Sequence, residues 1–167
     1  DDDMSVVLPP MGPGGEEISF FNVDSIFDFL LDTGMKPFVE LSFMPSPMAK
    51  RPTRGTFYWK PCIAPPKDEA QWQAYIQKFV RFLLNRYGKE EVETWFFEVW
   101  NEPDLKTPFF DGTQEDYFRL YEITAKAVKA VDDKLKVGGP ATSNSKWVAA
   151  FVDYCKVHVA PVDFITT

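Results

Sequence analysis

Two neighbouring polar side chains, an amide and a carboxyl group, follow the most apolar stretch of the chain. Residues 95–100 are aromatic or β-branched apart from one glutamate, which is typical of a buried strand, and Asn101, Glu102 and Pro103 come next. Proline cannot continue a strand ladder, so we expect the strand to end here. Ligands bind at the carboxyl ends of strands in α/β folds. Because nearby rings can raise the pKa of a carboxyl group, Glu102 is a candidate proton donor.

Aromatic side chains are concentrated on two predicted loops that would lie at the same end of the strands. The first loop covers residues 44–66 and is rich in proline, and the second covers residues 103–112. Loops of the first length are usually functional or disordered, and the aromatic content argues against disorder. We predict that the loops wall a small site for a flat ligand such as a sugar, with ordinary packing as the alternative. The candidate rings are Tyr58, Trp59, Phe109 and Phe110.

Hydrophobic periodicity predicts helices and strands in strict alternation. Helices are predicted over residues 22–33, 68–87, 113–131 and 143–155, and strands over residues 37–43, 95–100, 135–139 and 162–166. Asn22 or Asp24 would cap the first helix and Ser143 or Ser145 the last, while Thr113 and Asp116 suit a capping box. Alternation of this kind indicates parallel strands joined by helical crossovers.

Parallel strands with long loops at their carboxyl ends predict an α/β fold of the (β/α)8 TIM barrel type. Residues 138–140 lack the spacing of a glycine-rich phosphate loop, which disfavours a nucleotide-binding fold. A complete barrel has about eight strands and roughly 200 or more residues, whereas this chain has 167 residues. We therefore predict that residues 1–167 are an interior piece of one barrel domain. A half-barrel that pairs with itself or with another chain is the alternative.

Two further carboxylates lie within the predicted strands. Alternation places Glu40 and Glu98 on the barrel side of the sheet, opposite the apolar residues Val39, Leu41 and Phe43 of the first of these strands. A buried carboxylate needs a partner or must take up a proton. The centres of the predicted strands offer no inward cation, so we expect an outside partner or a protonated group, and we favour a structural role for both.

Composition restricts the partners. A net charge of −7 without a Lys/Arg cluster argues against nucleic acid and anionic membranes, and no apolar run could span a membrane. The N-terminal residues do not resemble a signal peptide. Cys62, Cys155 and the lone His158 form no metal-binding or redox pattern, so neither a metal, a cofactor nor a compartment is indicated.

Several blocks of the chain together resemble one known family. Residues 100–103, Trp-Asn-Glu-Pro after a strand, look like the acid/base motif of (β/α)8 retaining glycosidases. The wider blocks at residues 34–41, 95–103, 112–118 and 137–141 closely resemble glycoside hydrolase family 39, the β-xylosidases, with α-L-iduronidases as more distant relatives. The resemblance spans nearly the whole chain and implies that its strands are the third to the sixth of the barrel.

The resemblance implies a retaining exo-glycosidase that needs no cofactor and acts on xylosides or xylo-oligosaccharides. Glu102 would be the general acid and then the base, and Asn101 would hydrogen-bond the sugar 2-hydroxyl. The nucleophile would be a glutamate on the seventh strand, outside this chain, so the isolated chain is expected to be inactive. Asp2 and Asp3 resemble acidic residues that follow the family's second strand. They would either reach sugar hydroxyls or, as we favour, simply lie in a solvated N-terminal segment.

Three alternatives remain open from the sequence. The same chemistry could act on another glycoside, such as an iduronide, although no cation for a uronate is obvious on these loops. The chain could belong to a non-catalytic sugar-binding relative. It could also be a structural fragment whose open strand edges bind a partner chain. Oligomeric state and linkage preference are not indicated.

Overall fold

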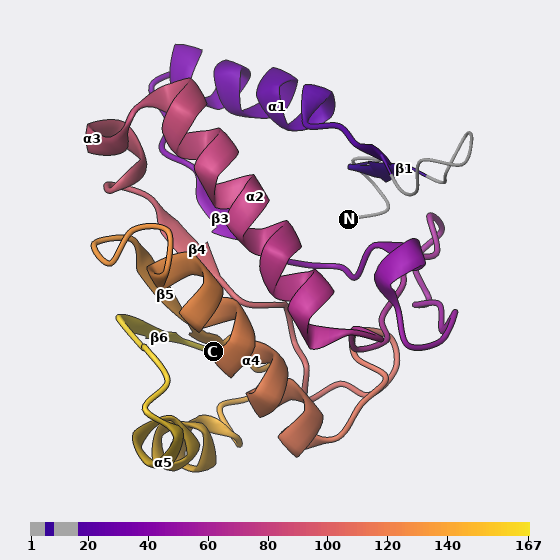
Figure 1. Cartoon of the computed structure of the whole chain (residues 1–167). Helices are drawn as coiled ribbons and strands as arrows, with labels where there is room; N and C mark the ends of the chain where they lie inside the picture. The colour runs from indigo at the N-terminus through magenta and orange to yellow at the C-terminus, as the bar shows by residue number, and fades with distance from the viewer. Residues whose placement is uncertain (1–5, 9–16) are drawn as a thin grey trace.

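A computed structural model describes residues 6–8 and 17–167, and its centre is a parallel sheet of four strands in the order β3-β4-β5-β6. These strands are β3 (Phe38–Glu40), β4 (Phe96–Glu98), β5 (Lys136–Pro140) and β6 (Phe164–Thr166). Figure 1 shows α2 (Glu69–Tyr87) and α4 (Gln114–Lys129) side by side in front of the sheet. The predicted parallel alternation is therefore confirmed.

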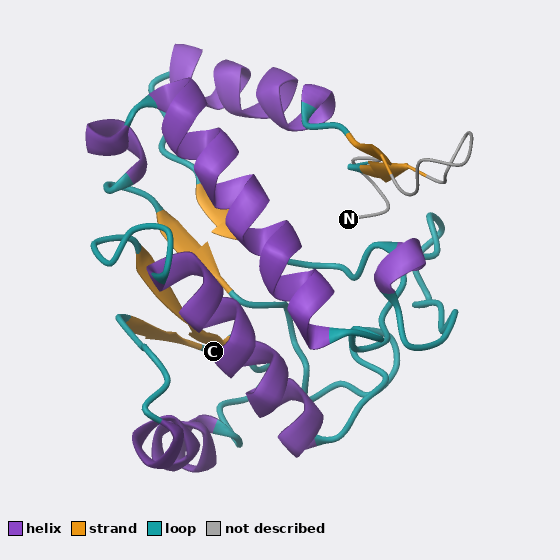
Figure 2. Cartoon of the chain, in the orientation of Figure 1, coloured by secondary structure: helices purple, strands orange, loops and turns teal. Residues whose placement is uncertain are grey.

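The other helices lie at the two sides of this pair. In Figure 2, α1 (Phe21–Asp32) lies beyond α2, and α5 (Val148–His158) lies beyond α4 next to β6. A short helix, α3 (Lys89–Val92), leads from α2 into β4. A two-stranded antiparallel pair, β1 (Val7–Leu8) and β2 (Glu17–Ile18), precedes α1. None of the helices in the described ranges is long and apolar enough to cross a membrane.

The two central helices form where the sequence provides caps and an apolar stripe. The Asp68 carboxylate caps α2 by accepting hydrogen bonds from the backbone N–H groups of Ala70 and Gln71. Gly88, with φ of +84°, ends the helix. Thr113 and Asp116 form the predicted capping box at the start of α4. The stripe on α2 is buried against the sheet and consists of Trp72, Tyr75, Ile76, Phe79, Val80 and Leu83.

Alternation along the strands separates two faces. Val39, Phe97 and Val137 are aligned in register and buried beneath the helices. The opposite face carries the rings of Phe38, Phe96 and Phe164, whose centroids lie 5.3–5.8 Å from one another. Phe38 keeps 54% of its surface exposed, so this aromatic layer lies on the uncovered side of the sheet. That side corresponds to the interior of a closed barrel.

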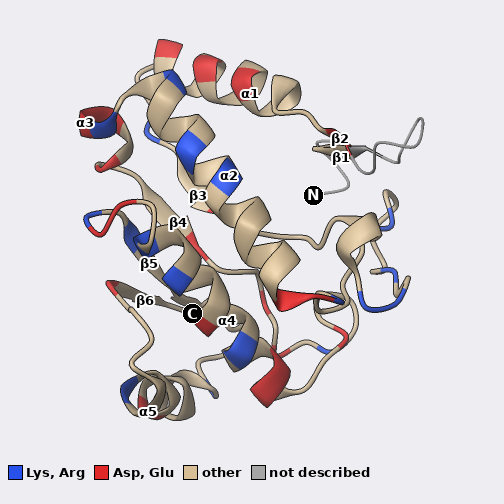
Figure 3. Cartoon of the chain, viewed as in Figure 1, with Lys and Arg blue, Asp and Glu red and all other residues tan. Residues whose placement is uncertain are grey.

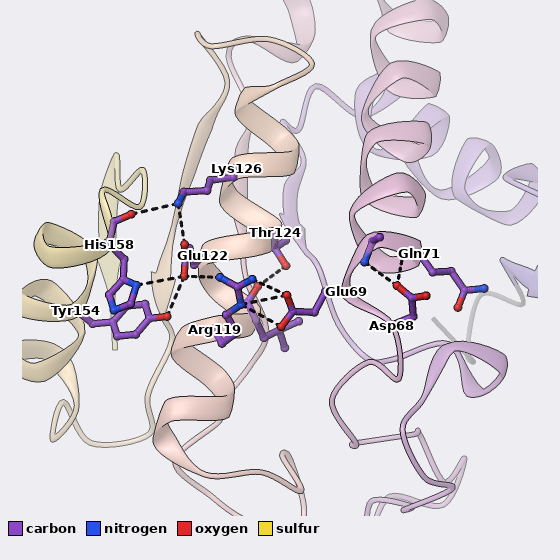
Figure 4. A network of polar contacts seen from close by, with 11 residues as sticks. Asp68, Glu69, Gln71, Arg119, Glu122, Thr124, Lys126, Tyr154 and His158 are labelled. Atoms are coloured by element: carbon purple, nitrogen blue, oxygen red, sulfur yellow. Dashed lines mark hydrogen bonds and ion pairs between the residues drawn. The ribbon is translucent and has the colours of Figure 1, made fainter.

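A charged cluster on the outer surface joins α4 to α5. Glu122 of α4 is buried, and its carboxylate accepts hydrogen bonds from Lys126 (2.7 Å), Arg119 (3.0 Å) and Tyr154 (2.9 Å), as Figure 4 shows. His158, the last residue of α5, stacks on the Tyr154 ring and lies 3.7 Å from the same carboxylate. Burial disfavours the charged form, but these donors outweigh it and lower the pKa of Glu122 to about 2.

Charges elsewhere also link neighbouring helices. Figure 3 shows acidic residues on α1, and two of them, Asp24 and Asp28, face Arg86 of α2. Arg119 of α4 reaches across to Glu69 of α2 at 2.6 Å. These pairs are largely exposed, so they orient the helices more than they stabilise them.

Several predicted boundaries are wrong. The first helix begins at Phe21 with Phe20 as its cap, and no side chain of Asn22 or Asp24 caps it. The last helix begins at Val148, after Trp147, instead of at a serine cap. The strand predicted over residues 37–43 ends at Glu40, and α3 and the β1–β2 pair were not predicted. Asp2 and Asp3 lie outside the described residues.

Candidate active site

Glu102 and Asn101 lie just beyond the carboxyl end of β4, an interior strand of the sheet. The Val99 N–H still donates to the Gly138 carbonyl (3.0 Å), in line with the ladder of β4 and β5. Trp100 and Glu102 then adopt positive φ angles of +71° and +44°, so the backbone turns out of the strand. Each such residue costs roughly 1 kcal/mol or more, and a turn of this kind persists only when its surroundings hold it.

The turn that carries Glu102 is held by its own backbone and by the next strand. The Glu102 N–H donates to the Ala141 carbonyl (2.8 Å), immediately after β5, and the Leu105 N–H donates to the Glu102 carbonyl (3.0 Å). The Trp100 indole is fully buried, and its Nε1 donates to the Phe109 carbonyl (2.9 Å). Backbone and indole together therefore fix where the half-buried Asn101 and Glu102 lie.

A pocket opens beside this turn, at the carboxyl end of the sheet. It holds about 450 Å³, within the range of small-molecule sites. Asn101, Trp59 and Phe109 line it, so three of the predicted site residues come together from two loops, Trp59 from the loop after β3 and the other two from the loop after β4. The remaining lining residues are Glu40, Ser42, Phe43 and Phe57.

The aromatic wall of the pocket is a connected set of rings. Phe57 and Trp59 are stacked, with centroids 4.7 Å apart and planes 7° apart. Phe109 meets the Phe57 ring edge to face at 5.2 Å, and Phe43 contacts Phe57, Phe109 and Trp100. Trp59 keeps 41% of its surface exposed, which leaves an aromatic surface open to a ligand.

Two predicted rings lie elsewhere. Tyr58 is 90% exposed and contacts Trp59 edge to face, but it does not line the pocket. Phe110 is fully buried between Trp100 and Tyr117, so it supports the floor beneath Trp100 and presents no surface to a ligand.

Sequence reasoning missed Phe43, Phe57 and the polar pair Glu40 and Ser42 as pocket residues. Phe43 was expected on the helix side of the sheet, but β3 ends at Glu40 and the alternation stops with it. The same predicted alternation places Glu40 and Ser42 on the barrel side of the sheet, but neither was predicted to line a ligand pocket.

The two strand carboxylates lie next to each other in register across β3 and β4. Burial raises the pKa of Glu40; a hydrogen bond from the Ser42 hydroxyl works against this rise, and the nearby Glu98 and Glu102 carboxylates add to it. Burial also raises the pKa of Glu98. An inward cation does exist at the start of a strand, since Lys136 lies over the Phe96 ring, 4.6 Å from its centroid. Of these groups, Glu40 and its partner Ser42 line the pocket, so this part of the pocket wall is polar and carries a carboxyl group.

The loop that carries Phe57 and Trp59 is tied to the loop that carries Phe109. Asp111 accepts hydrogen bonds from Arg51 (Nε, 2.6 Å) and from the Thr53 hydroxyl, and its N–H donates to the Ile63 carbonyl (2.8 Å). Chiefly because of Arg51, the pKa of Asp111 is lowered. Asp111 therefore helps to hold the two walls of the pocket together.

No group of three or more His, Cys, Asp or Glu side chains in residues 6–8 and 17–167 is arranged to hold a metal ion. The site consists of an amide, a carboxyl group and aromatic rings at the carboxyl end of a parallel sheet. Such a set can bind and protonate a neutral polar ligand. Fold and site together define an α/β-barrel protein with an acid/base candidate at the mouth of the barrel.

Comparisons with known proteins give the family. Residues 2–167 match the model of glycosyl hydrolases family 39, and the chain belongs to this family. The suggested resemblance is thereby confirmed. The chain is 51% identical over 166 residues to a β-xylosidase of Caldicellulosiruptor saccharolyticus, covering 99% of this chain and 34% of the relative. It is 43% identical over 157 residues to a β-xylosidase of Geobacillus stearothermophilus, covering 91% and 31%.

A solved structure has the same fold. The crystal structure of a monomeric β-xylosidase from Caulobacter crescentus CB15 matches with a TM-score of 0.91 and 42% identity, over 98% of this chain and 32% of that one. The prediction of a partial (β/α)8 barrel is confirmed. The chain spans about a third of the length of the curated relatives it matches.

Proposed function

We propose that this chain is part of a retaining glycoside hydrolase of the β-xylosidase type, with Glu102 as its general acid and base. The observation that carries the proposal is the position of Glu102: it follows Asn101 just beyond an interior parallel strand, beside an aromatic-lined pocket. The names of the relatives, β-xylosidases at 51% and 43% identity, support the reaction and the sugar.

In the first step, the Glu102 carboxylic acid donates its proton to the glycosidic oxygen while a second carboxylate attacks the anomeric carbon. The bond to the leaving group breaks, and a glycosyl-enzyme forms. In the second step, Glu102 as carboxylate takes a proton from water, which attacks the anomeric carbon and releases the sugar. The nucleophile would lie about 5–5.5 Å from Glu102 in a retaining enzyme, and we place it outside this chain.

Asn101 would hydrogen-bond the sugar 2-hydroxyl, an interaction that strengthens as charge develops in the transition state. Trp59 and Phe109 would pack against the apolar face of a sugar ring, and Phe57, which also lines the pocket, would hold Trp59 in place by stacking on it. The proposed substrates are therefore xylosides or xylo-oligosaccharides.

We further propose that residues 1–167 form the third to sixth strand–helix units of a single catalytic barrel. The parallel order β3-β4-β5-β6 and the uncovered aromatic layer suit a sheet that continues at both edges. The remaining units would supply the nucleophile and close the barrel.

The decisive experiment is Glu102→Ala in the complete catalytic domain, assayed with two aryl xylosides whose leaving groups differ in pKa. A general acid matters least for a good leaving group, so the loss should be about 100-fold or more with the poor leaving group and much smaller with the good one. Asp153→Ala, which removes an exposed carboxylate on α5, is the control. Equal losses on both substrates would reject Glu102 as the acid.

A further inference from the structure

The turn that carries Glu102 is attached to the segment after β5 by a second contact, close to the Glu102–Ala141 hydrogen bond. Asp104 accepts the Ser143 N–H through Oδ1 (2.8 Å) and the Ser143 hydroxyl through Oδ2 (2.8 Å). Both carboxylate oxygens are therefore used on one residue of the neighbouring segment. Charge-assisted bonds of this kind are stronger and more directional than neutral ones.

Asp104 and Glu102 belong to the same tight turn. The Leu105 N–H donates to the Glu102 carbonyl, which closes the turn around Pro103 and Asp104. The backbone has already left the strand ladder at Trp100, because Trp100 and Glu102 both have positive φ. Only Pro103 separates Asp104 from Glu102 in this closed turn, so a shift of Asp104 is passed on to Glu102.

We propose that Asp104 is a positioning residue for Glu102. It fastens the acid-bearing turn to the Ala141–Ser143 segment and so fixes the direction in which the Glu102 carboxyl points. Asp104 itself touches no reacting atom. This inference rests on the proposed function, since it assumes that Glu102 transfers the proton.

Because the contact between Asp104 and Ser143 is partly exposed, its effect on positioning can be distinguished from an effect on the stability of the fold. Ser143 is exposed and Asp104 is half-buried, so water can solvate both groups once the bond is lost. The unfolding temperature should change little. Proton transfer is more sensitive, because a misplacement of about 1 Å at the reacting atoms can cost up to about 100-fold in rate.

The test compares Asp104→Ala, Asp104→Asn and Asp153→Ala in the complete catalytic domain, with the same two aryl xylosides. Asp104→Ala should lose about 10-fold in kcat/KM with the poor leaving group and about 2-fold or less with the good one. Asp104→Asn should recover most of this loss, because its side-chain oxygen can still accept the Ser143 N–H. Asp153→Ala should match the unmodified protein on both substrates.

Equal losses on the two substrates, or the same defect in Asp104→Asn as in Asp104→Ala, would overturn the positioning role. Glu102→Ala separates this failure from that of the proposed function. If Glu102→Ala shows the leaving-group effect and Asp104→Ala does not, only the positioning role fails. If Asp104→Ala does not fold, Ser143→Ala gives the answer: it removes one of the two bonds and should show a smaller loss confined to the poor leaving group.

Discussion

The rings of Phe57 and Trp59 are stacked almost in parallel, 4.7 Å apart, although Tyr58 between them points to solvent. The pair presents the exposed part of Trp59 to the pocket that Asn101 also lines. Trp59 is therefore the platform for a ligand, Phe57 stacks on it and supports it, and Tyr58 lies outside the pocket.

The first prediction concerns this platform. Trp59→Ala should raise KM for an aryl xyloside roughly 5-fold, equivalent to about 1 kcal/mol, with a smaller change in kcat, because the ring contacts substrate and transition state alike. Tyr58→Ala is the matched comparison and should change KM much less. If the tyrosine variant had the larger effect, the assignment of the pocket wall would be wrong.

The second prediction concerns the tie between the two pocket loops. Asp111→Ala removes the acceptor for Arg51 and Thr53, so residues 44–66 should become more sensitive to limited proteolysis and KM should rise. The Arg51 side chain is 44% exposed, so the cost in global stability should be only about 1 kcal/mol or less. An unchanged cleavage pattern would show that the tie does not order the loop.

The third prediction is a pH dependence of stability that depends on Glu122. The pKa of Glu122 is about 2 in the folded protein and 4.5 in its ordinary state, so its ionised form stabilises the fold. This contribution is complete above about pH 4.5 and is lost as the pH falls toward 2. Glu122→Gln should therefore lower the free energy of unfolding by about 3 kcal/mol at pH 7.

Urea unfolding of both proteins between pH 2 and 7 measures the effect. The gap between the two curves should narrow as the pH falls below 4.5. A constant gap over that range would mean that the glutamine variant acts through packing alone, and not through the charge.

The fourth prediction is that residues 1–167 alone have no glycosidase turnover. They hold one candidate acid and, in our proposal, no nucleophile at the mouth of the barrel. A purified sample of this chain should leave an activated aryl xyloside intact over hours. Turnover that disappears in the Glu102→Ala version would place the second carboxylate within this chain and would overturn that part of the proposal.

Local patterns predicted the sheet and the central helices because the forces there are local. Each signal spans only a few residues of the chain: the apolar alternation around Val39 and around Phe97, the Asp68 cap, and the Thr113–Asp116 capping box. Glu102 could be placed after a strand from the sequence because Pro103 marks the end of that strand. By contrast, α1 and α5 begin without side-chain caps, and no residue type in the sequence marks these starts.

The pocket could be predicted only in part, because its walls come from segments that meet in space. Phe43 contacts Trp100 and Phe109, which are about sixty residues away along the chain, and this contact depends on where β3 ends. Phe110 and Tyr58 are aromatic and lie on the same loops as their neighbours Phe109 and Trp59. Only tertiary packing separates the buried ring and the solvent-facing ring from those that line the pocket.

The two glycines of β5 separate two aromatic layers. A Cβ on Gly138 would lie 2.5 Å from both the ring and the backbone carbonyl oxygen of Phe164 on one face, and a Cβ on Gly139 would lie 2.9 Å from the Tyr117 hydroxyl on the other. A smaller side chain at 164 would leave the carbonyl clash in place, so homologues should keep glycine at 138, whereas a larger residue at 139 should accompany the loss of the hydroxyl at 117. An exchange at 139 would have to leave the nearby Ala141 carbonyl, which holds the Glu102 turn, in place.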